Sequence, residues 1–188
     1  MKAADFIAAL ARLPHFDVTE GLKKELATSH IGQKAVCVMT SNLDLDTDGG
    51  NDPSIAWDKT HQSDTSLHWP KGAPVDANAT PFVVIPGGNW GKRHNLKVGD
   101  VGLAQIDSFP DVVPVIIADI GPKDRVGEGS IALHRAFGHE TVAGGKIRDV
   151  GMAGPFRMAL FPNSGTGVCR NHTYVAEQAL KLWVELGA

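Results

Sequence analysis

The chain has 188 residues, of which 43% are hydrophobic, and its 18 Lys and Arg against 21 Asp and Glu give a formal net charge of −3 at pH 7. This composition is typical of one compact domain, and we expect a monomer. Because there is no cationic excess, binding to nucleic acid is not expected. Because no apolar run approaches the roughly 20 residues of a membrane span, insertion into a membrane is not expected either.

The N-terminal residues indicate a helical extension. The pattern predicts an amphipathic helix over 2–12 and a second helix over 19–28, where Thr19 is placed as its cap. We therefore divide the chain into a helical extension over 1–30, packed on the rest, and a single main domain over 31–188.

Runs of β-branched and other apolar residues, bounded by Gly, Pro and Asp, predict the strands. They cover 34–40, 81–85, 101–106, 112–120 and 156–161. Between the first two lies a polar stretch from Ser41 to Ala79 with almost no hydrophobic period. So long an irregular stretch in a compact domain is usually functional.

Two further helices complete the expected fold. One covers 130–137 and ends at Gly138, and the other covers 173–186. We expect the inner side of the second helix to carry Val175, Leu180, Trp183 and Val184. The order of strands and helices fits a small, mixed, β-rich barrel with peripheral helices.

The sharpest local feature is a pair of acids at and beyond the end of the 112–120 strand. Asp119 ends an apolar run, and Glu128 follows it between Gly127 and Gly129, which allow unusual backbone angles and close approach of a ligand. Hydrolysis of a glycosidic bond needs two such carboxyl groups, one to protonate the leaving oxygen and one to activate water. The alternative is structural, with Asp119 beginning a turn and Glu128 capping the next helix.

The polar stretch opens with alternating acids at Asp44, Asp46 and Asp48. If the segment is extended, alternation places them on one face, and such a negative patch suits a cationic substrate. The spacing is similar to that of a calcium-binding EF-hand loop, but position twelve is Ile55 instead of a bidentate Glu, so an EF-hand is not expected. Calcium held by another geometry and an ordinary solvated turn are the alternatives.

Signals for a cofactor or for ring stacking are weak. The eight His residues show no metal-binding spacing, and no glycine-rich segment matches a nucleotide-binding fingerprint, so neither a metal nor another cofactor is expected. Trp57 and Trp69 lie in polar stretches, where their rings could stack on a sugar of the substrate. Packing against the barrel is the alternative for each of them.

Four stretches, taken in order, resemble glycoside hydrolase family 75, the fungal-type chitosanases. They are LDLDTDG at 43–49, the Asp-Pro pair at 52–53 with HQSDTS at 61–66, PFVVIP at 81–86, and IADIGPKDRVGEGSIAL at 117–133. Together they lie within about residues 34–162. The last stretch is the most specific, because it holds both acids of the pair.

The resemblance implies an endo-acting, inverting hydrolase that cleaves β-1,4 bonds of chitosan, on a six-stranded β-barrel of the double-psi kind. It implies that Asp119 and Glu128 are the essential carboxyl groups and that the partner is a polysaccharide. It also implies that Asp46 and Asp48 line the cleft. Members of the family are secreted, which implies an extracellular location, although the start of this chain has no recognisable signal peptide because charged residues interrupt its short apolar run.

The roles within the pair follow from the neighbours of each acid. We expect Glu128, among apolar residues and glycines, to be the general acid. We expect Asp119, close to Lys123 and Arg125, to be the general base, so that 31–188 forms one catalytic domain. Two alternatives stay open: hydrolysis of another amino-sugar polymer such as peptidoglycan, and a non-catalytic, expansin-like carbohydrate-binding barrel.

Overall fold

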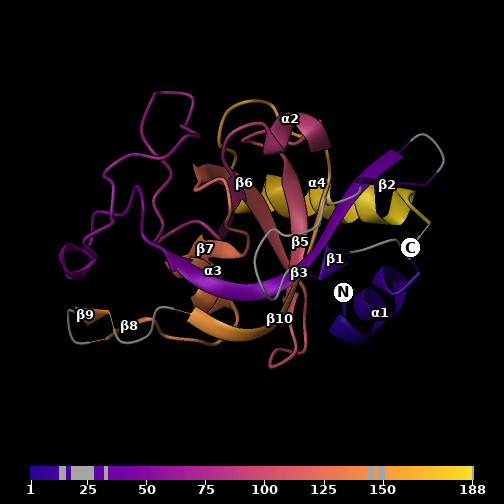
Figure 1. The fold of residues 1–188 in the computed structure, drawn as a ribbon, viewed down its shortest axis with the longest axis horizontal. Coiled ribbons are helices and arrows are strands. Elements are labelled where there is room, and N and C mark those ends of the chain that lie inside the picture. The colour runs from indigo at the N-terminus through magenta and orange to yellow at the C-terminus, as the bar shows by residue number, and fades with distance from the viewer. Residues whose placement is uncertain (13–15, 18–27, 32–33, 144–145, 148–150, 188) are drawn as a thin grey trace.

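The computed structural model describes residues 1–12, 16–17, 28–31, 34–143, 146–147 and 151–187 (Figure 1). These residues form one mixed β-sheet, a separate two-stranded sheet and a few helices. The expectation of a mixed, β-rich fold with peripheral helices is thereby confirmed. No helix in the described part of the chain is long and apolar enough to cross a membrane.

The main sheet is built from segments spread over the whole chain. Its strands are β1 (Phe16–Asp17), β2 (Thr28–Ile31), β3 (Lys34–Asp46), β4 (Phe82–Pro86), β5 (Val101–Ile106), β6 (Val113–Gly121), β7 (Glu128–Ser130) and β10 (Gly151–Leu160). The small second sheet contains β8 (Val142–Ala143) and β9 (Lys146–Ile147).

Six strands of the main sheet are paired in a closed ring. The order is β3, β10, β5, β6, β4 and β7, and β7 pairs again with β3. The β4–β6 and β3–β7 pairs are parallel, while β10 runs antiparallel to both of its neighbours. Because β4 and β6 are parallel neighbours, the loops that follow both strands lie at the same edge of the ring.

The central strands are almost entirely apolar because both of their faces are covered. Along β4 and β5 every residue is buried, and alternate residues enter two different core clusters. In β4, for example, Phe82 and Val84 belong to one cluster, and Val83 and Ile85 belong to the other. Such strands therefore appear in the sequence as continuous apolar runs.

Among the residues described, four short or medium-length helices lie around the ring of strands (Figure 1). They are α1 (Ala3–Leu10), α2 (Trp90–His94), α3 (Ile131–Ala136) and α4 (His172–Glu185), with a 3-10 turn at Pro53–Trp57. The first and last helices share one core cluster, in which the rings of Phe6 and Trp183 lie with their centroids 4.8 Å apart.

Some expected elements differ from the observed ones. The helix expected over 19–28 lies outside the described residues except for Thr28, which begins β2 instead. The strand expected over 34–40 runs on to Asp46, so the polar stretch begins as a strand and only then becomes irregular. The short elements β7 and α2 were not expected.

The prediction of which residues form the inner side of α4 was partly wrong. Val175, Ala179 and Trp183 are buried there, whereas Leu180 is 38% exposed and Val184 is 71% exposed. The buried residues follow the i, i+4, i+8 spacing of one helix face, on which the small Ala179 allows close packing. Cys37 and Cys169 are both buried free thiols.

Candidate functional site

An acid-rich cleft of about 890 Å³ lies where β3 and β6 end and β7 begins. Of the described residues that line it, seven are carboxylic acids and one, Arg125, is a permanently charged cation. The acids are Asp46, Asp48, Asp58, Asp64, Asp119, Asp124 and Glu128. The cleft thus contains both members of the predicted pair and two of the three alternating acids.

A β-bulge turns Asp119 toward this cleft. In the parallel pairing of β4 with β6, Val83 is opposite Ile117 but Val84 is opposite Asp119, so β6 carries one extra residue at Ala118. Asp119 therefore shares a face with Val84, which also lines the cleft. With Ala118 in regular pairing and no bulge, Asp119 would lie opposite Ile85 and point into the apolar core cluster that contains Ile85.

Three hydrogen bonds fix the Asp119 carboxylate. The Ser66 backbone N–H and hydroxyl donate to Oδ1 at 3.0 and 2.5 Å, and the Ile120 N–H donates to it at 2.7 Å. Ser66 is held there because the Leu67 N–H donates to the Ala118 carbonyl at 2.9 Å. Within the described residues no hydrogen bond reaches Oδ2, so this oxygen is left for a ligand in the cleft.

Glu128 enters the cleft from the first position of β7, opposite Asp44 of β3. Its Oε1 pairs with the Arg125 guanidinium at 3.0 Å. A Cβ placed on Gly121 would lie 2.7 Å from Glu128 Oε2, so this carboxylate lies over the glycine that ends β6, two residues after Asp119. The two predicted acids therefore come together from two different strands.

Three interpretations of the sequence around Glu128 differ from what the structure shows. Ser130, and not Glu128, caps α3, because its side chain accepts the Leu133 N–H at 3.1 Å. Gly127 does have an unusual angle, φ +96°, but the space that it saves is filled by the Asn42 carbonyl, so it serves strand packing and not ligand approach. Arg125 was expected beside Asp119 and instead pairs with Glu128.

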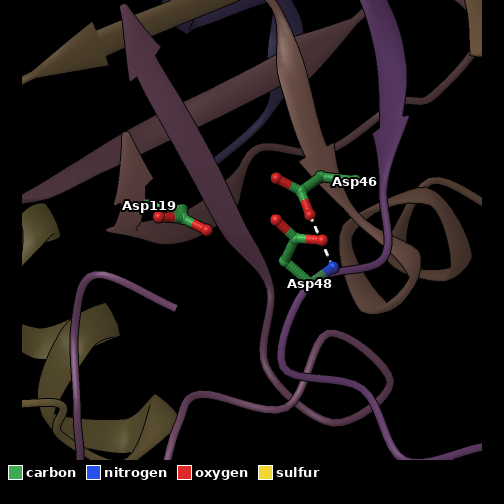
Figure 2. Close-up of side chains that lie close together, drawn as sticks. All are labelled: Asp46, Asp48 and Asp119. Carbon is green, nitrogen blue, oxygen red and sulfur yellow. Dashed lines mark hydrogen bonds between the residues drawn. The ribbon is translucent and has the colours of Figure 1, made fainter. Parts of the chain in front are cut away.

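The end of β3 adds two more acids to the site (Figure 2). Asp46 accepts the Asp48 N–H at 2.7 Å, and Asp48 in turn accepts the Gln62 N–H at 2.7 Å. Burial, and to a lesser degree the charges of Asp48, Asp119 and Glu128, raises the pKa of Asp46 to about 8. Asp46 therefore holds a proton at neutral pH, which lessens the repulsion among the carboxylates around it.

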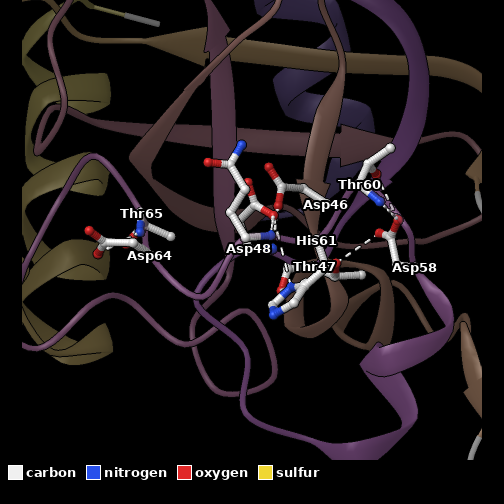
Figure 3. A network of polar contacts seen from close by, with 9 residues as sticks. Asp46, Thr47, Asp48, Asp58, Thr60, His61, Asp64 and Thr65 are labelled. Atoms are coloured by element: carbon white, nitrogen blue, oxygen red, sulfur yellow. Dashed lines mark hydrogen bonds and ion pairs between the residues drawn. The ribbon is translucent and has the colours of Figure 1, made fainter.

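A polar network stabilises the loop that follows β3 (Figure 3). The Thr47 hydroxyl donates to Asp58 at 2.8 Å, and a ring nitrogen of His61 lies 3.0 Å from the Thr47 carbonyl. Burial alone would raise the pKa of Asp58, but hydrogen bonds from Thr60 and Thr47 outweigh it and lower that pKa. These bonds hold Thr47, the residue between Asp46 and Asp48, in place.

Three of the predicted residues lie elsewhere. Asp44 is exposed and is not among the residues that line the cleft. Trp57 is 62% exposed, also outside that lining, and Trp69 packs, partly buried, against a core cluster. Asp44 is thus the register partner of Glu128 without lining the cleft, and neither Trp57 nor Trp69 is part of the cleft lining.

The acids of the cleft also form a set that could hold a cation. One carboxylate oxygen from each of Asp46, Asp48 and Asp119 lies within 4.8 Å of the others (Figure 2). Carboxylate oxygens are the ligands preferred by Ca²⁺ and Mg²⁺. The sequence pattern pointed to the first two only, because Asp119 comes from a distant strand.

Removing divalent cations tests this arrangement. Since we expect proton transfer by carboxyl groups and not a metal to carry the reaction, excess EDTA should leave the rate of polymer cleavage unchanged. The measurement is the initial rate of release of reducing ends before and after dialysis against EDTA. A loss of rate that added Ca²⁺ or Mg²⁺ restores would contradict this and identify the three aspartates as metal ligands.

Gly121 is expected to matter because it leaves room for the Glu128 carboxylate. A methyl group at this position would meet Oε2, the mobile end of the Glu128 side chain, so Gly121→Ala should displace that carboxylate and leave the fold intact. Misplacing a reacting group by about 1 Å costs up to roughly 10²-fold in rate, and we expect a loss of about tenfold or more. Unchanged cleavage by a variant with a wild-type melting temperature would contradict this role.

No family model matches the chain, and no curated protein matches its sequence. The resemblance to glycoside hydrolase family 75 therefore depends on the motif residues alone.

Proposed function

We propose that the protein is an endo-acting, inverting glycoside hydrolase of the chitosanase type that cleaves β-1,4 bonds of chitosan. The observation that carries the proposal is that Asp119 and Glu128 line one cleft, with the Glu128 carboxylate above Gly121. The motif at 117–133, which resembles the chitosanases, contains both acids. We further propose that the ring of six strands is a barrel of the double-psi kind.

The charge of the cleft supports a cationic substrate. Seven carboxyl groups line it, of which Asp46 is the one with a strongly raised pKa, and a single permanent cation among the described lining residues opposes the others. A concave site with one sign of charge concentrates ligands of the opposite sign, and the free amines of chitosan are protonated in mildly acidic solution. A deacetylated polymer is therefore favoured over an uncharged one.

The geometry suggests which of the two acids is the general base and which is the general acid. Asp119 is oriented through Oδ1, and its Oδ2 is left to take a proton from an attacking water. Glu128, at the start of β7, is placed to protonate the leaving oxygen. In an inverting mechanism the water attacks the face of the sugar opposite to the leaving group, which requires space for it between the two carboxyl groups.

Incubation of the purified protein with polymers tests the proposal. With highly deacetylated chitosan we expect an early fall in viscosity and release of short oligomers, as for cleavage within the chain. Peptidoglycan in the same buffer should stay intact. Cleavage of peptidoglycan without cleavage of chitosan would contradict the proposed substrate, and tight binding without any cleavage would instead identify a carbohydrate-binding protein.

A further inference from the structure

A second pocket, of about 630 Å³, lies beside the acid-rich cleft and has the opposite charge. Its lining includes Lys92 and Arg93 of α2 and Lys123 of the loop after β6, together with the turn at 87–89. No acidic side chain of the described residues is part of this lining. We call this site the basic pocket.

The three cations of the basic pocket are exposed and are not neutralised by described neighbours. None of the ion pairs between described residues involves Lys92, Arg93 or Lys123. Cations gathered around a concave surface, with no acid to pair with, produce a positive potential that attracts an anion. Arginine and lysine are also the side chains that bind carboxylate and phosphate groups most often.

The cleft and the basic pocket are joined by one short loop. Gly121 and Pro122 line the cleft, and the next residue, Lys123, lines the basic pocket. The loop is held against the turn after β4, because the Gly87 N–H donates to the Pro122 carbonyl at 3.4 Å. A polymer bound in the cleft would therefore pass close to the basic pocket.

We infer that the basic pocket binds a carboxylate or phosphate group carried by the polymer whose sugar backbone lies in the cleft. This inference rests on the proposed function and narrows it: the natural substrate is a polymer of the chitosan type, with free amines, that also bears acidic substituents. Plain chitosan, which carries only amines, fills the acidic cleft and leaves the basic pocket without a partner.

The test compares two polymers of equal length that differ in carboxylate content, chitosan and carboxymethyl chitosan. Binding is measured by calorimetry in an Asp119→Asn background, so that neither polymer is cleaved. The pocket variant is Lys92→Gln with Lys123→Gln. The matched control is Lys71→Gln with Lys181→Gln, which removes the same charge from exposed positions outside both sites.

Removing the two lysines should weaken the binding of carboxymethyl chitosan and should not weaken the binding of chitosan. The pocket variant should bind carboxymethyl chitosan roughly fivefold more weakly than the control does, because two favourable charge contacts of exposed groups are lost. It should bind chitosan as tightly as the control or more tightly, because repulsion of the amines is removed. Equal affinity of both variants for carboxymethyl chitosan would overturn the inference.

A further titration separates a group on the polymer from a small free anion. Inorganic phosphate should compete with carboxymethyl chitosan in the control and should have little effect in the pocket variant. Phosphate binding that requires the two lysines, together with unaltered binding of carboxymethyl chitosan, would assign the pocket to a free anion and overturn the polymer assignment. If neither chitosan nor carboxymethyl chitosan binds, the proposed function fails. The phosphate titration of the control and of the pocket variant then shows whether the basic pocket binds an anion.

Discussion

Asp119→Asn and Glu128→Gln should each lower the rate of chitosan cleavage by roughly 10²–10⁴-fold, the usual contribution of one proton-transfer group. Both substitutions keep the size of the side chain, so melting temperatures close to that of the wild type should accompany the loss. The rates are measured as release of reducing ends at saturating substrate. The exposed acid Asp5 of α1, which lies outside the cleft lining, supplies the control Asp5→Asn, which should retain full activity.

Chemical rescue separates the roles of the two acids. Azide is a nucleophile that needs no base, so it should restore cleavage by Asp119→Asn and not by Glu128→Gln. A substrate whose leaving group needs no protonation should restore Glu128→Gln only. The opposite pattern would exchange the roles.

The ion pair between Arg125 and Glu128 can be tested by substitution of Arg125. Its side chain is 61% exposed, whereas that of Glu128 is 13% exposed, so a bound sugar could displace the guanidinium from the carboxylate. Arg125→Gln should therefore lower the turnover number far less than Glu128→Gln does. Release of reducing ends at saturating chitosan measures both turnover numbers.

The second large effect is expected from Asp46→Asn and depends on pH. Burial raises the pKa of Asp46 from an ordinary value of 3.8 to about 8 in the folded protein. Between these two values the unfolded chain has released the proton and the folded protein still holds it. Stability therefore falls as pH rises across this window, and the contribution of the proton is complete only below about pH 4.

Asparagine at this position cannot ionise, so the variant should not show that fall. Relative to the wild type it should gain roughly 2–5 kcal/mol between pH 4 and pH 8, or on the order of 5–15 °C in melting temperature. Thermal unfolding is followed in EDTA, so that a bound cation cannot neutralise the acids. Parallel curves for the wild type and Asp46→Asn across this range would show that Asp46 is ionised in the folded protein at neutral pH.

Much of the framework could be predicted because its strands are long apolar runs with clear ends. The strand 101–106 was predicted with its observed bounds, since both faces of β5 are buried and every residue in it is apolar or uncharged. The strands expected over 81–85 and 112–120 lie within one residue of β4 and β6. Three-residue β7 has no detectable period, and the polar end of β3 does not look like a strand, so both were missed.

The site itself was only partly accessible from the sequence. Asp119 and Glu128 were identified by their flanking residues, but the bulge at Ala118 that turns Asp119 into the cleft leaves no sign in the amino-acid order. The hydrogen bonds of Ser66 reach Asp119 from a loop 53 residues earlier in the chain. The ion pair of Arg125 with Glu128, three residues apart, depends on the shape of the loop before β7. The burial of Asp46 was not expected, because alternating acids are usually a feature of solvated segments.

The most direct measurement is a proton NMR time course of a fully deacetylated chitosan hexamer with the wild-type protein and with Asp119→Asn and Glu128→Gln. For an inverting enzyme acting on β-1,4 bonds, the wild type should produce reducing ends that appear first as the α-anomer, and each variant should produce almost none in the same time. A hexamer that stays intact with the wild type, or that is cleaved at the wild-type rate by either variant, would contradict the assignment of Asp119 and Glu128 as the catalytic pair of a chitosanase.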